Sequence, residues 1–381
     1  MRSRAGTAPA VARTARGPAS FTFSCTRCGE SVPASPEVWR CSCGGPLVPD
    51  LPPFDASRLD QDDRSVWRYR VLLPIAPRTP EVSLGEGGTP LVGAPFDGLD
   101  ISWKLEYLQP TGSYKDRGAT VVATALSAAG VRAAVEDSSG NAGASLAAYL
   151  GRAGIGLRLF VPRGTPRRKL RQSAAYGAEV DDSAPDRTAA TVAAQAAAGR
   201  GVVYAGHVYS PYFLAGLTTL AYEVWEDMGR EAPDHVVVPV GHGLLLLGVY
   251  RGFRNLVESG ACRKMPRFHG VQVRACAPVA EAFERGASVP DPVACATTVA
   301  RGIRISDPPR GAEVLAAVRG TGGRLTSVGE ADVRRAQAEL ARLGWSVEPT
   351  AAVAPAGLNA LAAEIGRGET VVVPLTGTGA R

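Results

Sequence analysis

Short apolar runs alternate with amphipathic segments along most of this chain, and this alternation restricts the fold more than any other feature. The clearest runs are residues 133–136, 156–161, 202–204 and 235–240, and segments with helical spacing follow the first two. Strands and helices that alternate at this spacing form parallel sheets with helices on both faces. The sequence therefore predicts a doubly wound α/β architecture, with ligands bound at the carboxyl ends of the strands.

A single lysine lies in a turn between a predicted strand and a predicted helix. Residues 101–107 alternate as a strand does, residues 110–118 form the turn around Lys115, and residues 119–130 carry small apolar side chains at helical spacing. A lysine at the mouth of a buried helix loses hydration, so its amine is easier to deprotonate and can attack a carbonyl to form a Schiff base. Most loop lysines are simply solvated, and Lys115 alone favours that interpretation.

Three further turns at predicted strand ends stand out, and two of them carry groups that can bind anions. Residues 138–143 open a helix, and their serines, amide and free N–H groups suit a carboxylate. Residues 241–244 follow the clearest strand, and their glycines let backbone amides approach a phosphate. This second turn lacks the spacing of a dinucleotide-binding turn, because Leu246 stands at the position of the third glycine. The third turn follows the last predicted strand and carries the hydroxyl of Thr376. Each turn taken alone is also explained by backbone shape.

Four cysteines near the start of the chain form a candidate metal site: Cys25, Cys28, Cys41 and Cys43. Two turns that each offer two thiolates can close a tetrahedral site, for which zinc is the usual metal. The second pair is one residue closer than the standard spacing, so its geometry is tighter, and a ribbon whose cysteines only pack is the alternative. Because the protein fills all four positions, a bound zinc would be structural.

Composition limits the partners and the location of the chain. It has 381 residues, 45% apolar content and 20% charge, which is enough for two domains and a large core. Without Arg2, Arg4, Arg13 and Arg16 the net charge falls from +6 to +2, so we expect no nucleic-acid partner. No run reaches the length of a membrane span, and we expect a disordered tail over residues 1–20 rather than a transit peptide. Seven cysteines with this clustering favour a reducing cytoplasm.

Taken together, these motifs resemble the threonine synthase branch of the fold type II pyridoxal-phosphate enzymes. The resemblance runs in collinear order over residues 21–381. The motifs that carry it are residues 84–91, 110–118, 138–143, 239–248, 347–352 and 375–379. It implies a homodimer of two-domain chains similar to the tryptophan synthase β subunit. The implied parts are a cysteine-rich, zinc-ribbon-like knuckle (21–50), a large cofactor-binding domain (51–118 and 216–381) and a small mobile domain (119–215).

The resemblance also implies roles for individual residues. Lys115 would form a Schiff base with pyridoxal phosphate and then move protons at the Cα atom of an amino-acid substrate. Asn141 would donate to the ring oxygen of the cofactor, and Thr376 would meet its pyridine nitrogen. Two sets of residues have the remaining roles. The substrate carboxylate would be bound by the turn that contains Ser138, Ser139 and Gly140. The cofactor phosphate would be bound by the backbone amides of Gly241, His242, Gly243 and Leu244.

The reaction implied is that of threonine synthase, which converts O-phosphohomoserine and water into threonine and phosphate. The chain departs from the family at His242, where asparagine is usual, and at Leu244, where a small or polar residue is usual. It also has Phe213 where threonine synthases tend to have an arginine that could pair with a phosphorylated substrate. The basic run over residues 167–169 could compensate.

Other functions therefore stay open. A related enzyme could carry out β-elimination or β-replacement on serine, threonine or a phosphoserine-like compound. A protein of another class could keep the fold and zinc ribbon for binding without turnover, although the intact Lys115 argues against it. A nicotinamide-dependent enzyme would rest on the turn at Gly241 alone.

Overall fold

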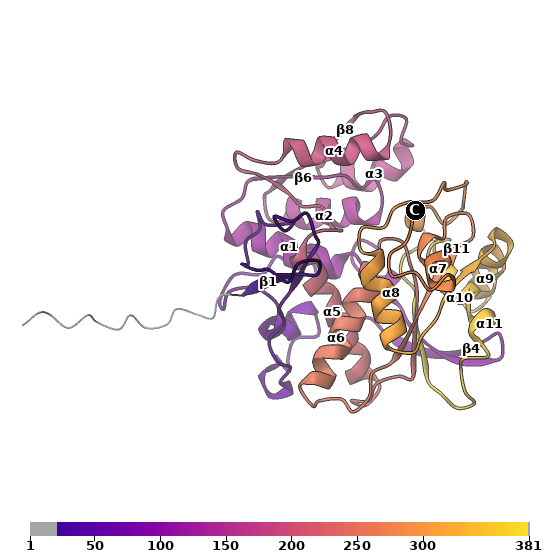
Figure 1. The fold of residues 1–381 in the computed structure, drawn as a ribbon. Helices are drawn as coiled ribbons and strands as arrows, with labels where there is room; N and C mark the ends of the chain where they lie inside the picture. Colours follow the sequence, from indigo (N-terminus) through magenta and orange to yellow (C-terminus); the bar gives the residue numbers. More distant parts are fainter. Residues whose placement is uncertain (1–20, 380–381) are drawn as a thin grey trace, which may run out of the picture.

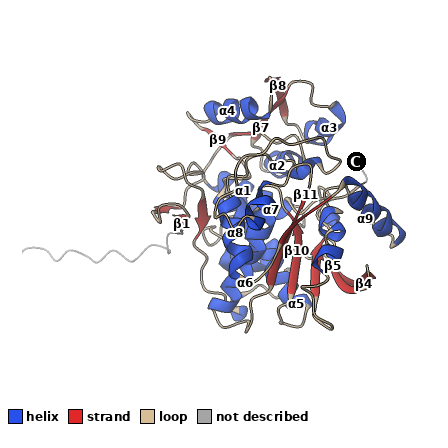
Figure 2. Cartoon of the chain, turned by 45° about the vertical axis from the view of Figure 1, so that its right-hand side comes forward, coloured by secondary structure: helices blue, strands red, loops and turns tan. Residues whose placement is uncertain are grey.

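A computed structural model describes residues 21–379 of the chain (Figure 1), so the tail predicted to be disordered, residues 1–20, lies outside the described residues. Two sheets with helices on their faces form the body, and a small three-stranded sheet precedes them. Figure 2 shows one of these sheets above the other, with α3 (Arg167–Ala175) and α4 (Arg187–Ala197) beside the upper one. The arrangement confirms the predicted α/β class with parallel sheets.

The larger sheet has six strands, and only one edge strand is antiparallel to its neighbour. The order is β12 (Leu325–Val328), β11 (Arg267–Val273), β10 (His235–Pro239), β13 (Val371–Pro374), β5 (Leu99–Lys104) and the antiparallel edge strand β4 (Leu91–Phe96). β10 is buried along its whole length because helices cover both faces. Val236 and Val238 pack into one hydrophobic core and Val237 into another.

Different helices fill these two cores. One core contains side chains from α5 (Pro211–Asp227), α6 (Leu244–Glu258), α7 (Pro278–Glu284) and α8 (Gly311–Gly320). The other contains side chains from α9 (Glu330–Arg342), α10 (Val353–Ala356) and α11 (Leu358–Leu361). The faces of the sheet are therefore closed, and ligands have access only at the strand ends.

The smaller sheet has four parallel strands in the order β8 (Glu179–Ala184), β7 (Gly156–Pro162), β6 (Ala133–Glu136) and β9 (Val202–Tyr204). Its helices are α1 (Asp116–Ala128), α2 (Asn141–Arg152), α3 and α4. Ala190 and Ala194 of α4 pack with Val135 and Phe160 of the sheet. The predicted boundaries of the small domain, residues 119–215, stay a prediction.

One predicted strand is shorter than its pattern suggested. The alternation over residues 101–107 continues past Lys104, but β5 ends there and Glu106–Leu108 form a turn of 3-10 helix, η3. Glu106 is completely buried, where Arg117 binds its carboxylate. The strand stops because this ion pair takes Glu106 out of the alternating pattern.

The N-terminal ribbon consists of β1 (Thr22–Cys25) between β2 (Ser31–Pro33) and β3 (Leu47–Pro49), all antiparallel. It packs on α5, where the rings of Phe23 and Tyr212 meet edge to face with centroids 5.1 Å apart. Three turns of 3-10 helix lie elsewhere: η1 (Ala56–Arg58), η2 (Val66–Leu72) and η4 (Arg301–Ile303).

Two observations concern the environment of the chain. Among the described residues, no helix is both long enough and apolar enough to cross a membrane. Cys276, which follows β11, forms a disulfide with Cys295 in the loop before η4. The pattern of the seven cysteines did not predict this disulfide.

Candidate active site

Three of the predicted site segments follow neighbouring strands of the large sheet. Lys115 comes after β5, Thr376 after β13 and Gly241 after β10, and these strands are adjacent and parallel. Because parallel strands end at the same edge of a sheet, the topology brings the three segments together.

Backbone contacts fix the lysine turn against the C-terminal segment. The amide of Tyr114 donates to the carbonyl of Thr376 at 3.2 Å, and the amide of Thr378 donates to the carbonyl of Gly112 at 2.9 Å. Gly112 has φ +82°, which glycine adopts without strain. Lys115 is half-buried, and its Nζ lies 4.7 Å from the ring centroid of Tyr114 and 5.6 Å from that of Phe213.

A buried carboxylate holds the start of α1 from behind. Asp116 accepts hydrogen bonds from the amide of Thr111 at 2.7 Å and from Ser145 Oγ of α2 at 2.6 Å. Burial raises the pKa of Asp116 to about 6 although these bonds oppose the shift. The residue after Lys115 therefore joins two helices and limits the movement of the lysine backbone.

The turn after β6 reaches the same C-terminal segment. Asn141 begins α2, and its Nδ2 donates to Glu348 Oε1 at 2.9 Å. A Cβ atom on Gly377 would lie 2.5 Å from Glu348 Oε1 and 3.1 Å from Asn141 Nδ2, so only glycine fits there. Ser138 and Ser139 are half-buried in this turn, which thus lies beside the segment that carries Thr376.

The turn after β10 leaves free backbone amides at the start of a helix. Gly243 has φ +87°, and a Cβ atom there would lie 2.2 Å from Val314 Cγ2. Within residues 21–379, no hydrogen bond is donated by the backbone amides of residues 241–244. Free amides at the start of a helix as long as α6 can bind a phosphate.

Three buried polar atoms at these turns lack a hydrogen-bond partner in the part of the chain that the structure describes: Ser113 Oγ, His242 Nδ1 and Thr376 Oγ1. Buried polar atoms are normally paired, so these point to a polar ligand. A pyridine nitrogen beside Thr376, a phosphate on the amides of residues 241–244 and a carbonyl carbon at Lys115 would together use the site. The residues present therefore fit pyridoxal phosphate, while the role assigned to each stays a prediction.

The region around Phe213 is crowded and apolar. Phe213 is completely buried, and a Cβ atom on Gly118 would lie 2.4 Å from its ring. Two imidazoles lie beside Phe213. The ring centroid of His207 is 5.7 Å from that of Phe213 and 5.9 Å from that of His242. Burial and the nearby charge of Lys115 lower the pKa of His242 to about 3. A neutral imidazole therefore lies beside the free backbone amides of residues 241–244.

Sequence reasoning did not assign a role to Glu348, His207 or Glu136. Glu348 lies in a motif that supported the resemblance, and its contact with Asn141 depends on the fold. The sequence could have marked His207 as a candidate site residue, because the chain has only four histidines.

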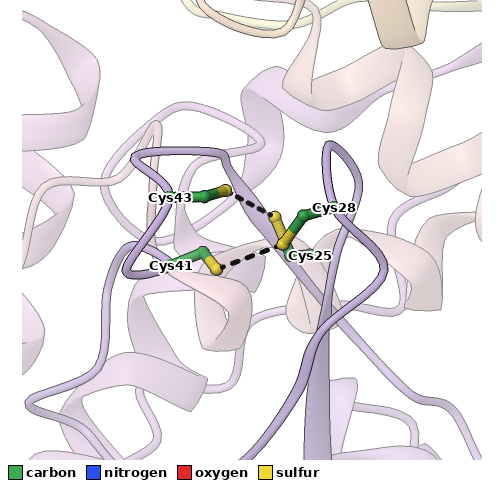
Figure 3. Close-up of side chains that lie close together, drawn as sticks. All are labelled: Cys25, Cys28, Cys41 and Cys43. Carbon is green, nitrogen blue, oxygen red and sulfur yellow. Dashed lines mark hydrogen bonds between the residues drawn. The ribbon is translucent and has the colours of Figure 1, made fainter.

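The four cysteines of the ribbon do come together (Figure 3). Their sulfur atoms all lie within 4.8 Å of one another, with Cys25 to Cys43 at 3.5 Å and Cys28 to Cys41 at 3.7 Å. Sulfur atoms around a tetrahedral zinc are about 3.8 Å apart, given a bond length of about 2.3 Å. Burial opposes ionisation of Cys25, but nearby backbone amides outweigh it and lower its pKa to about 7. The cluster is compatible with structural zinc.

This fold and this site define a fold type II pyridoxal-phosphate enzyme. Residues 82–377 match the family of pyridoxal-phosphate dependent enzymes, and the chain belongs to that family. Its relatives place it in the threonine synthase-like group. It is 33% identical to the threonine synthase of Methanosarcina acetivorans over 371 residues, covering 94% of this chain and 91% of the relative. It is 36% identical to that of Synechocystis sp. over 329 residues, covering 82% and 83%.

Solved structures agree on the fold. The crystal structure of a threonine deaminase from T.th. superposes with a TM-score of 0.65 at 26% identity, covering 77% of this chain and 92% of the other. A fungal L-serine ammonia-lyase from Rhizomucor miehei gives a TM-score of 0.67 at 22% identity, covering 78% and 95%. The comparison with solved structures thus extends over most of both chains.

Proposed function

We propose that this enzyme is a threonine synthase, which converts O-phosphohomoserine and water into threonine and phosphate. The observation that carries the proposal is the meeting of Lys115, Thr376 and the free amides of residues 241–244 at one sheet edge. The similarity to threonine synthases over 94% of the chain supports the choice among enzymes of this fold.

Each residue of the site would then have a defined task. Bound pyridoxal phosphate supplies a sink for the electrons left at Cα when a proton is removed. Lys115 Nζ would accept that proton and return it later. The turn from Ser138 to Gly140 would hold the substrate carboxylate, and Asn141 would orient the cofactor ring. Thr376 would offer a neutral hydroxyl to the pyridine nitrogen, which tempers the electron demand of the ring relative to a carboxylate.

Exclusion of water belongs to the same proposal. Residues 119–215 would close over the substrate so that water enters only when it is needed as a reactant. We also propose that the enzyme is a homodimer, as the family resemblance implies, and that it works in the cytoplasm, as the clustering of its cysteines favours. Light scattering on the purified protein tests the dimer, and a fluorescent fusion of the full chain tests the location.

Absorbance and phosphate release test the proposed reaction. The purified protein should be yellow, change its spectrum with O-phosphohomoserine and release phosphate. Lys115→Ala should remove the colour and the turnover, whereas Lys264→Ala, at a lysine 51% exposed in a surface ion pair, should change neither. A response to serine or threonine but not to the phosphorylated compound would instead support the β-elimination enzyme, because Phe213 offers no charge to a phosphate. A colourless protein that pyridoxal phosphate cannot restore would contradict the proposal.

A further inference from the structure

A buried carboxylic acid and an imidazole form a pair at the end of the small sheet. Glu136 is the last residue of β6, and His207 follows β9, the strand that pairs with β6. His207 Nδ1 lies 2.7 Å from Glu136 Oε1, and the exposed fractions of the two side chains are 6% and 0%. Such a pair costs energy to bury, so it needs an explanation.

The pair lies close to the lysine site. The His207 ring contacts Phe213, whose ring lies 5.6 Å from Lys115 Nζ, and it also contacts His242 of the anion-binding turn. Since Nδ1 is held by Glu136, the free nitrogen of the ring is Nε2, on the opposite side. Within the described residues, Nε2 forms no hydrogen bond, and Glu136 Oε2 is also unpaired.

The electrostatics place a proton on each partner. Burial and the neighbouring Asp137 raise the pKa of Glu136, although Arg187 opposes this, and burial, Lys115 and His242 lower the pKa of His207. Arg187 is itself engaged by Asp137 at 3.0 Å. Both groups are thus favoured in their neutral forms, with the Glu136 proton donated to Nδ1 and the imidazole proton on Nε2.

We propose that Glu136 and His207 form a proton-donating pair that serves the group leaving the substrate. The proposal rests on the proposed function, which supplies that step. When the bond between carbon and the departing oxygen breaks, its electron pair stays on oxygen. The Nε2 proton of His207 passes to this oxygen, and the Glu136 proton passes to Nδ1. Water that later adds its hydroxyl group to carbon returns its proton to the pair.

The chemistry of the leaving group gives the pair its purpose. A phosphate that departs without a proton is a strong base, so a positioned acid lowers the barrier. General acids typically contribute about 10²-fold to 10⁴-fold in rate. A chloride leaves as a weak base and needs no proton, so the same pair should matter little for a chlorinated substrate.

This contrast defines the first experiment. His207→Gln and Glu136→Gln are compared with the parent on O-phosphohomoserine and on 2-amino-4-chlorobutyrate, with product release and visible absorbance recorded. We expect about 10²-fold or greater loss on the phosphate ester, a loss below about threefold on the chloride, and unchanged cofactor absorbance. Equal slowing on both substrates, or no slowing on either, would overturn the proposal.

The chain contains a matched control. The buried imidazole of His235 and the carboxylate of Glu369, which is 29% exposed, form a second imidazole–carboxylate contact, also 2.7 Å, at the amino ends of the large-sheet strands. Glu369→Gln should leave both rates unchanged. A selective loss on the phosphate ester in this variant would show that the effect is not local to the lysine site, and the proposal would fail.

A second experiment does not depend on turnover. Histidine labelled with ¹⁵N gives signals from only four residues, and His207→Gln assigns the one of interest. We expect a neutral His207 with its proton on Nε2 between about pH 6 and pH 8, in the range where an ordinary histidine titrates. A proton on Nδ1 with Nε2 bare would refute the pair as a donor. Absence of colour and turnover in the parent would instead refute the proposed function, and the two failures are therefore distinguishable.

Discussion

Replacement of Arg117 by methionine should destabilise the fold more than any change to a surface ion pair. Arg117 is completely buried two residues after Lys115 and binds two carboxylates. Its Nε and Nη2 contact Glu106 at 2.7 Å, and its Nη1 and Nη2 contact Glu223 at 2.6 and 2.7 Å. Loss of one partner from a buried ion pair costs about 3–5 kcal/mol, because the other charge is left without compensation.

Most of that cost should arise at one of the two carboxylates. Glu223 keeps Lys104, whose Nζ lies 3.1 Å away, after Arg117 is gone. Among residues 21–379, Glu106 keeps only neutral donors, Thr89 Oγ1 at 2.6 Å and Gln109 Nε2 at 3.3 Å. The double variant Arg117→Met/Glu106→Gln should therefore recover most of the stability lost in Arg117→Met.

The destabilisation should also depend on pH. Burial opposes ionisation of Glu223, but Arg117 and Lys104 outweigh it and lower its pKa from 4.5 to about 2. A lowered carboxyl pKa stabilises the fold above about pH 4.5, and this contribution is lost as the pH falls toward 2. Arg117→Met lacks much of this contribution, so its difference from the parent should be largest near pH 7 and shrink below about pH 5.

Urea unfolding followed by tryptophan fluorescence measures these differences. Arg335→Met is the matched control, since Arg335 also contacts two carboxylates, Asp97 at 3.0 Å and Glu339 at 3.1 Å, but is 38% exposed. We expect it to cost less than about 1 kcal/mol. The prediction fails if the free energy of unfolding of Arg117→Met lies within about 1 kcal/mol of that of the parent at pH 7. It also fails if the difference between the two is the same at about pH 3 as at pH 7.

Three further predictions concern the cofactor, the ribbon and the helix behind the lysine. Gly243→Ala should weaken pyridoxal phosphate binding at least about tenfold in an absorbance titration, because its Cβ would meet Val314 at 2.2 Å and its φ is +87°; an unchanged affinity would exclude the turn as the phosphate site. Metal analysis should find one zinc per chain, and Cys25→Ser should lose it and lower the thermal midpoint by several degrees, whereas a metal-free parent purified without chelators would contradict the site. Asp116→Asn should remove a pH dependence from the stability of the fold. The raised pKa of the Asp116 carboxyl stabilises the fold below about pH 4, and this contribution is lost as the pH rises through 6. The thermal midpoints of parent and variant should therefore diverge between about pH 4 and pH 7.

The sequence predicted those parts of the fold that depend on local patterns. β10 is one such part, because five buried residues in a row are typical of a parallel strand covered on both faces. The glycine-rich turns were predicted for a related reason, since Gly112 and Gly243 adopt positive φ values that glycine tolerates. The end of β5 was predicted wrongly because Glu106 fits an alternating pattern, while its partner Arg117 is eleven residues away in the chain.

Contacts between distant segments account for what the sequence could not provide. Glu136 and His207 are separated by 71 residues and meet because β6 pairs with β9. In the sequence, each is an ordinary polar residue that a surface could solvate equally well. Only burial makes them informative, because an acid and an imidazole removed from water must share protons to remain neutral. Burial cannot be seen in the sequence, yet it is burial that would keep the proton of the pair available to a leaving group. The chemistry proposed for the pair therefore depends on the topology of the fold and not on a sequence motif.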